Sequence, residues 1–186
     1  AAATFSLNVD MDEPLEQRRA AIERLRETHG ALRRSDEAPT SDTPFHAAWW
    51  LEGEAGRGRV KVEITLDPQP VPKVQWLELT SVPEPDPRAR AAARALVASA
   101  NGGTLEISLG DDVDRAVVER DLFLVRTLLG PGRLGVPIAA DGSSATFEVI
   151  AERGTLDLAV SVDAEGRLLS AKWTPRPVSP PLSDVR

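Results

Sequence analysis

An internal duplication constrains the fold of this chain more than any other feature. Residues of matching character recur in the two halves of the 186-residue sequence at offsets of 94 to 98 residues. The matched pairs are Leu25 and Leu122, Leu32 and Leu129, Trp49 and Phe147, Val60 and Leu156, Val62 and Leu158, Ile64 and Val160, Asp67 and Asp163, and Leu79 and Trp173. In tandem repeats one copy often covers the apolar face of its neighbour, so we expect two copies of one small unit in a pseudo-twofold arrangement.

The first half combines one helical pattern with several strand patterns. Residues 4–9 alternate apolar and polar side chains, which predicts a half-buried strand. Acidic residues and Pro14 then precede a predicted amphipathic helix that runs from Leu15 to about Arg34. Turn formers follow, and three further strands are expected at residues 48–54, 59–66 and 73–80. The short connections between them favour antiparallel pairing.

The second half repeats this order after a break. A Pro-rich segment and an Ala-rich helix, stopped by Asn101-Gly102-Gly103, form the expected connection. The predicted elements that follow are a strand at 104–109, a helix at 113–129, and strands at 147–152, 155–162 and 167–174.

These patterns predict an α+β fold of two tandem β-α-β-β-β repeats, with helices packed on mostly antiparallel sheets. The expected boundaries are 1–82 for the first repeat, 83–103 for the Pro-rich linker and connecting helix, 104–177 for the second repeat, and 178–186 for a C-terminal tail.

Composition excludes several classes of function. The 22 Lys and Arg residues against 29 Asp and Glu residues give a net charge of -7 without a basic stripe, which disfavours nucleic-acid binding. No apolar run reaches the roughly 20 residues of a membrane span. Without cysteine there are no disulfides, thiolate metal sites or cysteine nucleophiles. We expect a cytoplasmic protein by default, with an extracytoplasmic location open if a leader has been removed, because the chain starts at Ala1 rather than Met.

No catalytic or cofactor motif stands out, so the sequence favours a non-enzyme without a metal or cofactor. His29 continues the apolar stripe of the first helix, where a structural role is expected, and neither histidine has a metal-ligand spacing. No serine lies in a nucleophile motif. The glycines of GPGRLG follow a helix instead of opening one, which predicts a terminator rather than a phosphate loop.

The tryptophans are the strongest candidate binding residues. Trp49 and Trp50 are adjacent on a predicted strand, so their side chains point to opposite faces and cannot both enter one core. One of them is expected at an inter-repeat seam, an edge or a ligand cleft. The candidate ligand-binding residues are Trp49, Trp50, His46, Trp76 and Trp173.

Two segments carry a resemblance to a known family. The run ATFEVIAERGTLDLAVSVDAEGRLLSAKW, which follows a helix and RLG, and the run FHAAWWLEGEAGRGRVKVEITL resemble the small cystatin-like or NTF2-like α+β domains that accompany bacterial serine hydrolases of the β-lactamase-like kind. The likeness covers about 60 residues of each half. It implies an accessory or ligand-shielding role and transfers no catalytic residue.

Three hypotheses follow. The first is a non-catalytic binding or interaction domain, with a role as the accessory part of a larger bacterial hydrolase, that contacts a protein partner as a monomer or homodimer. The second is a small NTF2-like enzyme or carrier of an apolar ligand, with a pocket between helix and sheet that holds Trp49 or Trp50, His46 and a carboxylate. The third is a paired-module metal-dependent fold of the glyoxalase kind, which the first strand disfavours because it offers no ligands.

Overall fold

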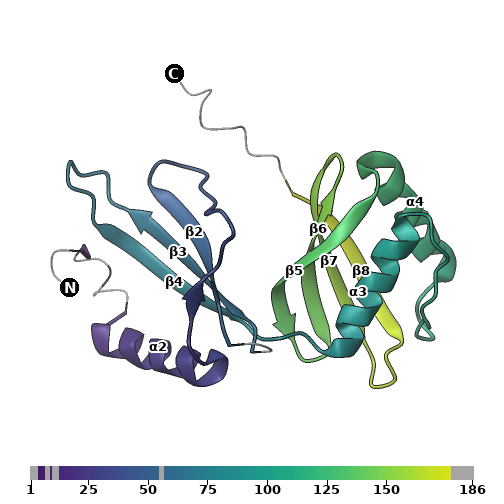
Figure 1. Ribbon diagram of the computed structural model, residues 1–186, viewed down its shortest axis with the longest axis horizontal. Helices are drawn as coiled ribbons and strands as arrows, with labels where there is room; N and C mark the ends of the chain where they lie inside the picture. Colours follow the sequence, from purple (N-terminus) through teal and green to yellow (C-terminus); the bar gives the residue numbers. More distant parts are fainter. Residues whose placement is uncertain (1–3, 7–8, 10–12, 55–56, 177–186) are drawn as a thin grey trace. The chain divides into compact units, whose positions relative to one another are not determined.

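A computed structural model describes residues 4–6, 9, 13–54 and 57–176 of the chain. The chain divides into two compact units, which we call unit 1 (Ala1–Glu84) and unit 2 (Pro85–Arg186). Each unit contains one four-stranded antiparallel sheet and at least one helix (Figure 1). The α+β class and the antiparallel sheets predicted from the sequence are therefore confirmed.

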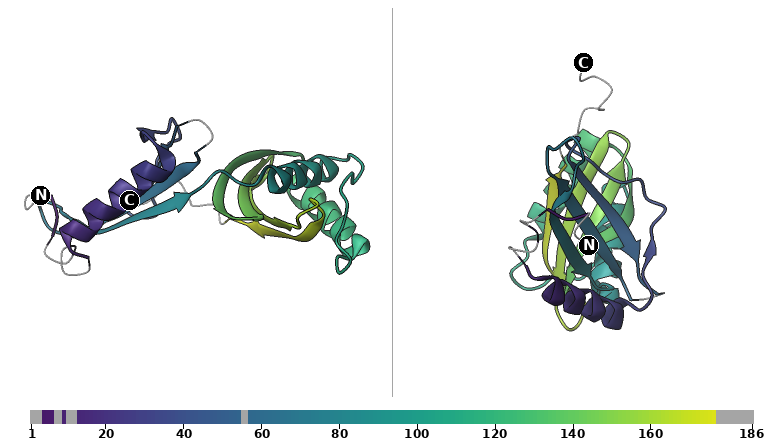
Figure 2. Two further views of the ribbon diagram at one scale, coloured as in Figure 1. Left: turned by 90° about the horizontal axis from the view of Figure 1, so that it is seen from below. Right: turned by 90° about the vertical axis from the view of Figure 1, so that its left-hand side faces the viewer.

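Unit 1 is one long helix followed by a four-stranded meander. Its elements are α2 (Leu15–His29), β1 (Arg33–Arg34), β2 (His46–Glu52), β3 (Arg59–Leu66) and β4 (Val74–Val82). The strands are hydrogen-bonded in chain order and form sheet A. α2 runs along one face of this sheet (Figure 2).

α2 ends five residues earlier than the sequence pattern predicted. Gly30 has φ of 73°, a left-handed conformation that favours glycine, and its N–H binds the carbonyl of Arg26. A Cβ at Gly30 would lie 2.5 Å from the carboxyl carbon of Glu54, so a larger residue would also clash. The chain leaves the helix here and enters β1.

Unit 2 has two helices over its sheet. Its elements are α3 (Pro87–Ala100), α4 (Arg115–Leu129), β5 (Gly132–Asp141), β6 (Ser144–Ala151), β7 (Gly154–Val162) and β8 (Leu168–Pro175). The four strands, again in chain order, form sheet B. α3 packs on β5, β6 and β7, whereas α4 packs on α3 and β8. The apolar side chains of both helices and of sheet B form one buried core.

Aspartates start both helices of unit 2. The side chain of Asp86 accepts a hydrogen bond from the N–H of Arg88, with Pro87 at the first position of α3. Asp114 accepts one from the N–H of Ala116 in the same way. Both contacts satisfy helix N–H groups that have no partner within the helix.

Strand pairing supports the predicted duplication residue by residue. Trp49 pairs with Val62, which pairs with Leu79, and the corresponding row of sheet B is Phe147, Leu158 and Trp173. The ladder also shifts register at equivalent places, between Thr65 and Leu66 and between Ser161 and Val162. The shared irregularity agrees with the predicted repeat.

The helices match at a different offset from the one expected. α2 and α4 have 15 residues each, start exactly one hundred positions apart, and both end at a glycine in the left-handed region, Gly30 and Gly130. Leu25 therefore corresponds to Val125 rather than to Leu122, and Leu32 to Gly132 rather than to Leu129. The sequence comparison misaligned the helix because several shifts of one apolar stripe on another look alike.

The order of elements also differs from β-α-β-β-β. Residues 104–109 form no strand ladder, and residues 7–8 of the first predicted strand, 4–9, lie outside the described residues. What remains is one parallel bridge in each unit, Phe5 with Val74 and Leu109 with Leu168. Each unit instead gains a strand directly after the helix, β1 or β5. β5 was missed because Gly135 and Pro137 interrupt its pattern, and an edge strand such as β5 tolerates proline.

The expected linker and connecting helix prove to be part of a domain core. Six residues of α3 join the buried core of unit 2, namely Ala89, Ala92, Ala93, Leu96, Val97 and Ala100. The predicted tail, 178–186, lies outside the described residues, and the pseudo-twofold relation between the halves stays a prediction.

Candidate functional site

An apolar cavity between α2 and sheet A is the main candidate site. We call it pocket A. Its volume is about 680 Å³. It is lined by Ile22, Leu25, Arg26, Gly30, Ala31, Leu32, Trp49, Leu51, Val60, Val62 and Leu79. Binding pockets for small molecules typically occupy about 300–1,000 Å³ and have mainly apolar walls.

Pocket A exists because one helix covers a face that two helices cover in unit 2. Trp49 and Leu51 are only half-buried in unit 1, whereas their counterparts Phe147 and Val149 are 0% and 2% exposed. The apolar residues of α2 reach one part of sheet A but do not close over it: Ile22 and Leu25 are half-buried as well. The empty space lies between these two partly covered surfaces.

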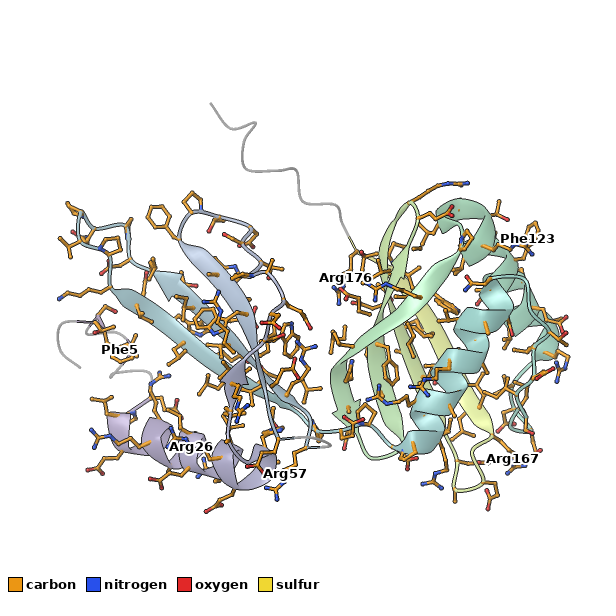
Figure 3. The ribbon with its side chains drawn as sticks, viewed as in Figure 1. Phe5, Arg26, Arg57, Phe123, Arg167 and Arg176 are labelled. Atoms are coloured by element: carbon orange, nitrogen blue, oxygen red, sulfur yellow. The ribbon has the colours of Figure 1, made fainter. Side chains whose placement is uncertain are left out.

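Arg26 contributes the one charged side chain to the lining of pocket A. It lies in the last turn of α2, where a cation also complements the negative end of the helix dipole. Its side chain is exposed, and among the described residues its guanidinium has no ion pair or hydrogen bond. Figure 3 labels Arg26 on α2. Pocket A therefore presents apolar walls with one available positive charge.

Trp50 lies on the opposite face of sheet A and has a structural partner. The guanidinium carbon of Arg59 lies 3.9 Å from the centre of the Trp50 ring, a cation-π contact. Arg59 is only 2% exposed, and its Nη2 lies 2.8 Å from Glu37 Oε1 and 3.4 Å from Glu52 Oε1. We assign Trp50 to this packing rather than to a ligand site.

His46 and Trp76 share that opposite face, because His46 pairs with Thr65 and Thr65 with Trp76. His46 Nδ1 lies 2.6 Å from Asp42 Oδ1, and Nε2 lies 3.8 Å from Glu63 Oε1. Of the two predicted combinations, His46 with Trp49 does not occur, since three positions along a strand place the two side chains on opposite faces, whereas His46 and Trp50 do share a face. Trp76 is 39% exposed and lines no part of pocket A.

Trp173 lines a second and smaller cavity, in unit 2. This cavity has a volume of about 350 Å³ and lies between α4 and strands β7 and β8. Leu124, Leu128 and Leu156 line it together with Trp173. The five predicted residues are therefore distributed over three places, and the structure does not bring them together.

His29 has the structural role expected for it. It is completely buried at the end of α2. Its Nδ1 lies 2.6 Å from the carbonyl oxygen of Arg57, and its Nε2 lies 2.8 Å from the hydroxyl of Ser81. Both ring nitrogens are used to join the helix end to the strands.

The two carboxyl groups with a lowered pKa, those of Asp86 and Asp163, belong to a helix cap and a turn. Hydrogen bonds from the Arg88 side chain, and then from its backbone N–H, lower the pKa of Asp86 to about 2. At Asp163, partial burial would raise the pKa of the carboxyl group. Hydrogen bonds from the backbone and guanidinium of Arg167 outweigh this effect, and the pKa is lowered. Among the described residues, no group of three or more His, Cys, Asp or Glu side chains could hold a metal ion.

One surface feature was missed by sequence reasoning. α4 exposes four large apolar side chains, Val117, Phe123, Leu124 and Leu128, and Phe123 is 65% exposed (Figure 3). The sequence does indicate this surface, because the helix predicted at 113–129 has more apolar residues than one buried face can hold.

Comparisons with known proteins add no identity to this geometry. Neither protein-family models nor curated proteins match the sequence. None of the helices within the described residues has the length and apolar character required to cross a bilayer.

Proposed function

We propose that the protein is a non-catalytic binding module and that pocket A is its binding site. The observation that carries the proposal is the difference between the two repeats. The face of sheet B that is sealed by α3 corresponds to a face of sheet A that borders a cavity of about 680 Å³.

The energetics support a binding role. Apolar side chains that face an unfilled cavity lack dispersion contacts on that side. Each Å² of apolar surface that stays in contact with water also forgoes about 25 cal/mol of stabilisation. Trp49 and Leu51 are half-buried, whereas their counterparts Phe147 and Val149 are buried in the core of unit 2. A ligand in pocket A would recover this contact.

The side chains that line pocket A fit binding better than catalysis. Its lining contains one guanidinium and no carboxylate, imidazole or hydroxyl group. Acid-base or nucleophilic catalysis needs such groups within hydrogen-bond reach of a substrate. An accessory role within a larger hydrolase, as the family resemblance implies, would use the same pocket.

A carrier of a small apolar ligand is the second candidate, favoured by the pocket volume alone. Both versions predict saturable binding of anilinonaphthalene sulfonate or dodecanoate, each an apolar body with an anionic group. The test is a titration of the intact chain, followed by tryptophan fluorescence, with Trp49→Phe and Trp50→Phe variants as a matched pair. We expect Trp49→Phe to remove most of the signal change and Trp50→Phe to preserve it. A folded chain that binds neither probe would refute the proposal.

A further inference from the structure

The second repeat shows what kind of object fits the face that pocket A leaves open. In unit 2 that face is covered by α3, whose buried residues are mostly alanines: Ala89, Ala92, Ala93 and Ala100. Such small side chains let the helix axis come close to the strands. The sheet residues below it belong to β6 and β7, and they include Phe147 and Leu158.

Unit 1 has the counterpart of this surface without the covering helix. Trp49 and Val62 correspond to Phe147 and Leu158 in the strand ladders, and both line pocket A. In the described part of unit 1, α2 is the helix over this face, and α2 corresponds to α4 rather than to α3. The missing layer is therefore a helix at the place of α3.

The end of α3 meets a positive charge that also has a counterpart. The guanidinium of Arg126 lies against Gly102, just beyond the end of α3; a Cβ on that glycine would lie 3.0 Å from Arg126 Nη1. A helix carries a partial negative charge at its C-terminal end, so a cation there is favourable. Arg26 is the counterpart of Arg126, and it borders pocket A without a carboxylate partner in the described structure.

Hydrogen bonds to the backbone at the edge of sheet B join the end of α3 to β5, and they too have no equivalent in the described part of unit 1. Asn101, the residue after α3, accepts a hydrogen bond from the N–H of Gly132 at 2.8 Å and donates one to its carbonyl at 2.7 Å. The counterpart of Gly132 is Leu32, which also lines pocket A. Neither backbone group of Leu32 has a hydrogen bond among the described residues. At one end of pocket A, the guanidinium of Arg26 and the backbone N–H and carbonyl of Leu32 thus lack partners among the described residues.

We propose that pocket A is the seat of an amphipathic α-helix from a partner protein, which lies over sheet A as α3 lies over sheet B. The helix presents small apolar side chains to Trp49 and Val62, and its C-terminal end lies beside Arg26 and Leu32. This inference rests on the proposed function, since it names the occupant of the same site. Anchoring of a helix by apolar residues at i, i+3, i+4 and i+7 in a groove is a common mode of recognition.

The test uses the intact chain and two fluorescent synthetic peptides. The first peptide has the sequence of residues 86–103, which contains α3 with Asn101 and Gly102. The second carries Ala89→Leu and Ala93→Leu, which enlarges the apolar stripe. Binding is measured by fluorescence anisotropy. A third peptide with Arg94→Pro in its centre serves as the control, because proline breaks a helix.

Three protein variants locate the bound peptide. Leu51→Asp places a carboxylate in the apolar wall of pocket A, on the strand whose counterpart β6 lies under α3, so it should abolish binding. Arg26→Gln should weaken binding about three- to tenfold, the range expected for a charge at a helix end. Arg24→Gln removes a neighbouring α2 arginine that does not line the pocket, and it should leave the affinity unchanged.

The outcomes separate the two proposals. Saturable binding of a helical peptide that Leu51→Asp abolishes and Arg26→Gln weakens supports the inference. Binding of dodecanoate without binding of either peptide overturns the helix and leaves the binding function intact. No binding of any probe overturns both. Peptide binding that survives Leu51→Asp would place the peptide elsewhere and also overturn the inference.

Discussion

Trp49 and Phe147 hold matching positions in the strand ladders of sheets A and B, yet of the two only Phe147 is sealed from solvent. Trp49 pairs with Val62 in sheet A, and Phe147 pairs with Leu158 in sheet B. Phe147 is 0% exposed beneath α3, whereas Trp49 is half-buried at a cavity of about 680 Å³. The same strand geometry therefore serves as a core in one unit and as a pocket wall in the other.

Truncation at these two positions should have unequal effects on stability. Phe147→Ala leaves a cavity in a closed core, and we expect it to lower the free energy of unfolding of unit 2 by about 3–5 kcal/mol. Trp49→Ala removes a side chain that already borders empty space, so the loss for unit 1 should be smaller, about 1–2 kcal/mol. Urea unfolding followed by circular dichroism gives both values. Equal losses would mean that Trp49 is as tightly packed as Phe147.

Filling pocket A should stabilise unit 1. Leu79→Trp introduces the residue that Trp173 supplies in the equivalent row, and cavity-filling substitutions commonly add about 0.5–2 kcal/mol. Thermal unfolding of the variant measures the change. Trp76→Leu, on the other face of sheet A, is the control for a change in tryptophan content. A strong loss of stability in Leu79→Trp would show that pocket A lacks the room that its volume indicates.

The two histidines should differ sharply in their importance for stability. His29→Ala leaves the carbonyl of Arg57 and the hydroxyl of Ser81 without their buried partner, and it opens a cavity, so we expect a loss of about 2–4 kcal/mol. His46→Ala removes partly exposed contacts of the imidazole with Asp42 and Glu63, which should cost less than about 1 kcal/mol. Denaturant unfolding of both variants compares them directly. A result in which His46→Ala costs as much as His29→Ala would contradict these assignments.

The low pKa of Asp86 predicts an acid-dependent stability of unit 2. Because hydrogen bonds from Arg88 lower this pKa from 3.8 to about 2 in the folded chain, the ionised carboxylate stabilises the fold above pH 3.8. This contribution is lost as the pH falls from 3.8 through about 2. Asp86→Asn keeps an oxygen that can cap α3 but does not titrate.

The measurement is the difference in stability between the wild type and Asp86→Asn at several pH values. The wild type should be the more stable of the two at neutral pH, and the difference should shrink through the window below pH 3.8. Other carboxyl groups titrate in both proteins and cancel in this comparison. A constant difference down to pH 2 would show that Asp86 is not held by Arg88.

Much of this fold could be read from the sequence. The alternating residues of β3 and β7 and the equivalence of their rows were visible because apolar side chains repeat with period two on a half-buried sheet. What failed were the features set by tertiary context. Pro137 and Gly135 interrupt the strand pattern of β5, which can contain a proline because it is an edge strand. Gly30 ends α2 inside a continuous apolar stripe.

The candidate site was predictable only in part. One of Trp49 and Trp50 was expected at an inter-repeat seam, an edge or a ligand cleft, but the sequence could not say which one, since a period of two shows that their faces differ and not which face is open. The lining of pocket A, which contains Trp49, and the position of Arg59 over the Trp50 ring resolve this. The role of Arg26 had no signal in the sequence, because it depends on the comparison of one helix end with its counterpart in the other repeat.

The central claim, that pocket A seats an amphipathic helix on Trp49, is tested most directly by the four indole N–H signals of the intact chain in nitrogen-15 NMR spectra. Tryptophan-to-phenylalanine variants assign each signal, and the Ala89→Leu, Ala93→Leu peptide is then titrated. The account predicts that the Trp49 signal shifts until saturation while those of Trp50, Trp76 and Trp173 remain in place. A titration in which Trp49 does not move, or in which Trp173 moves instead, would contradict it.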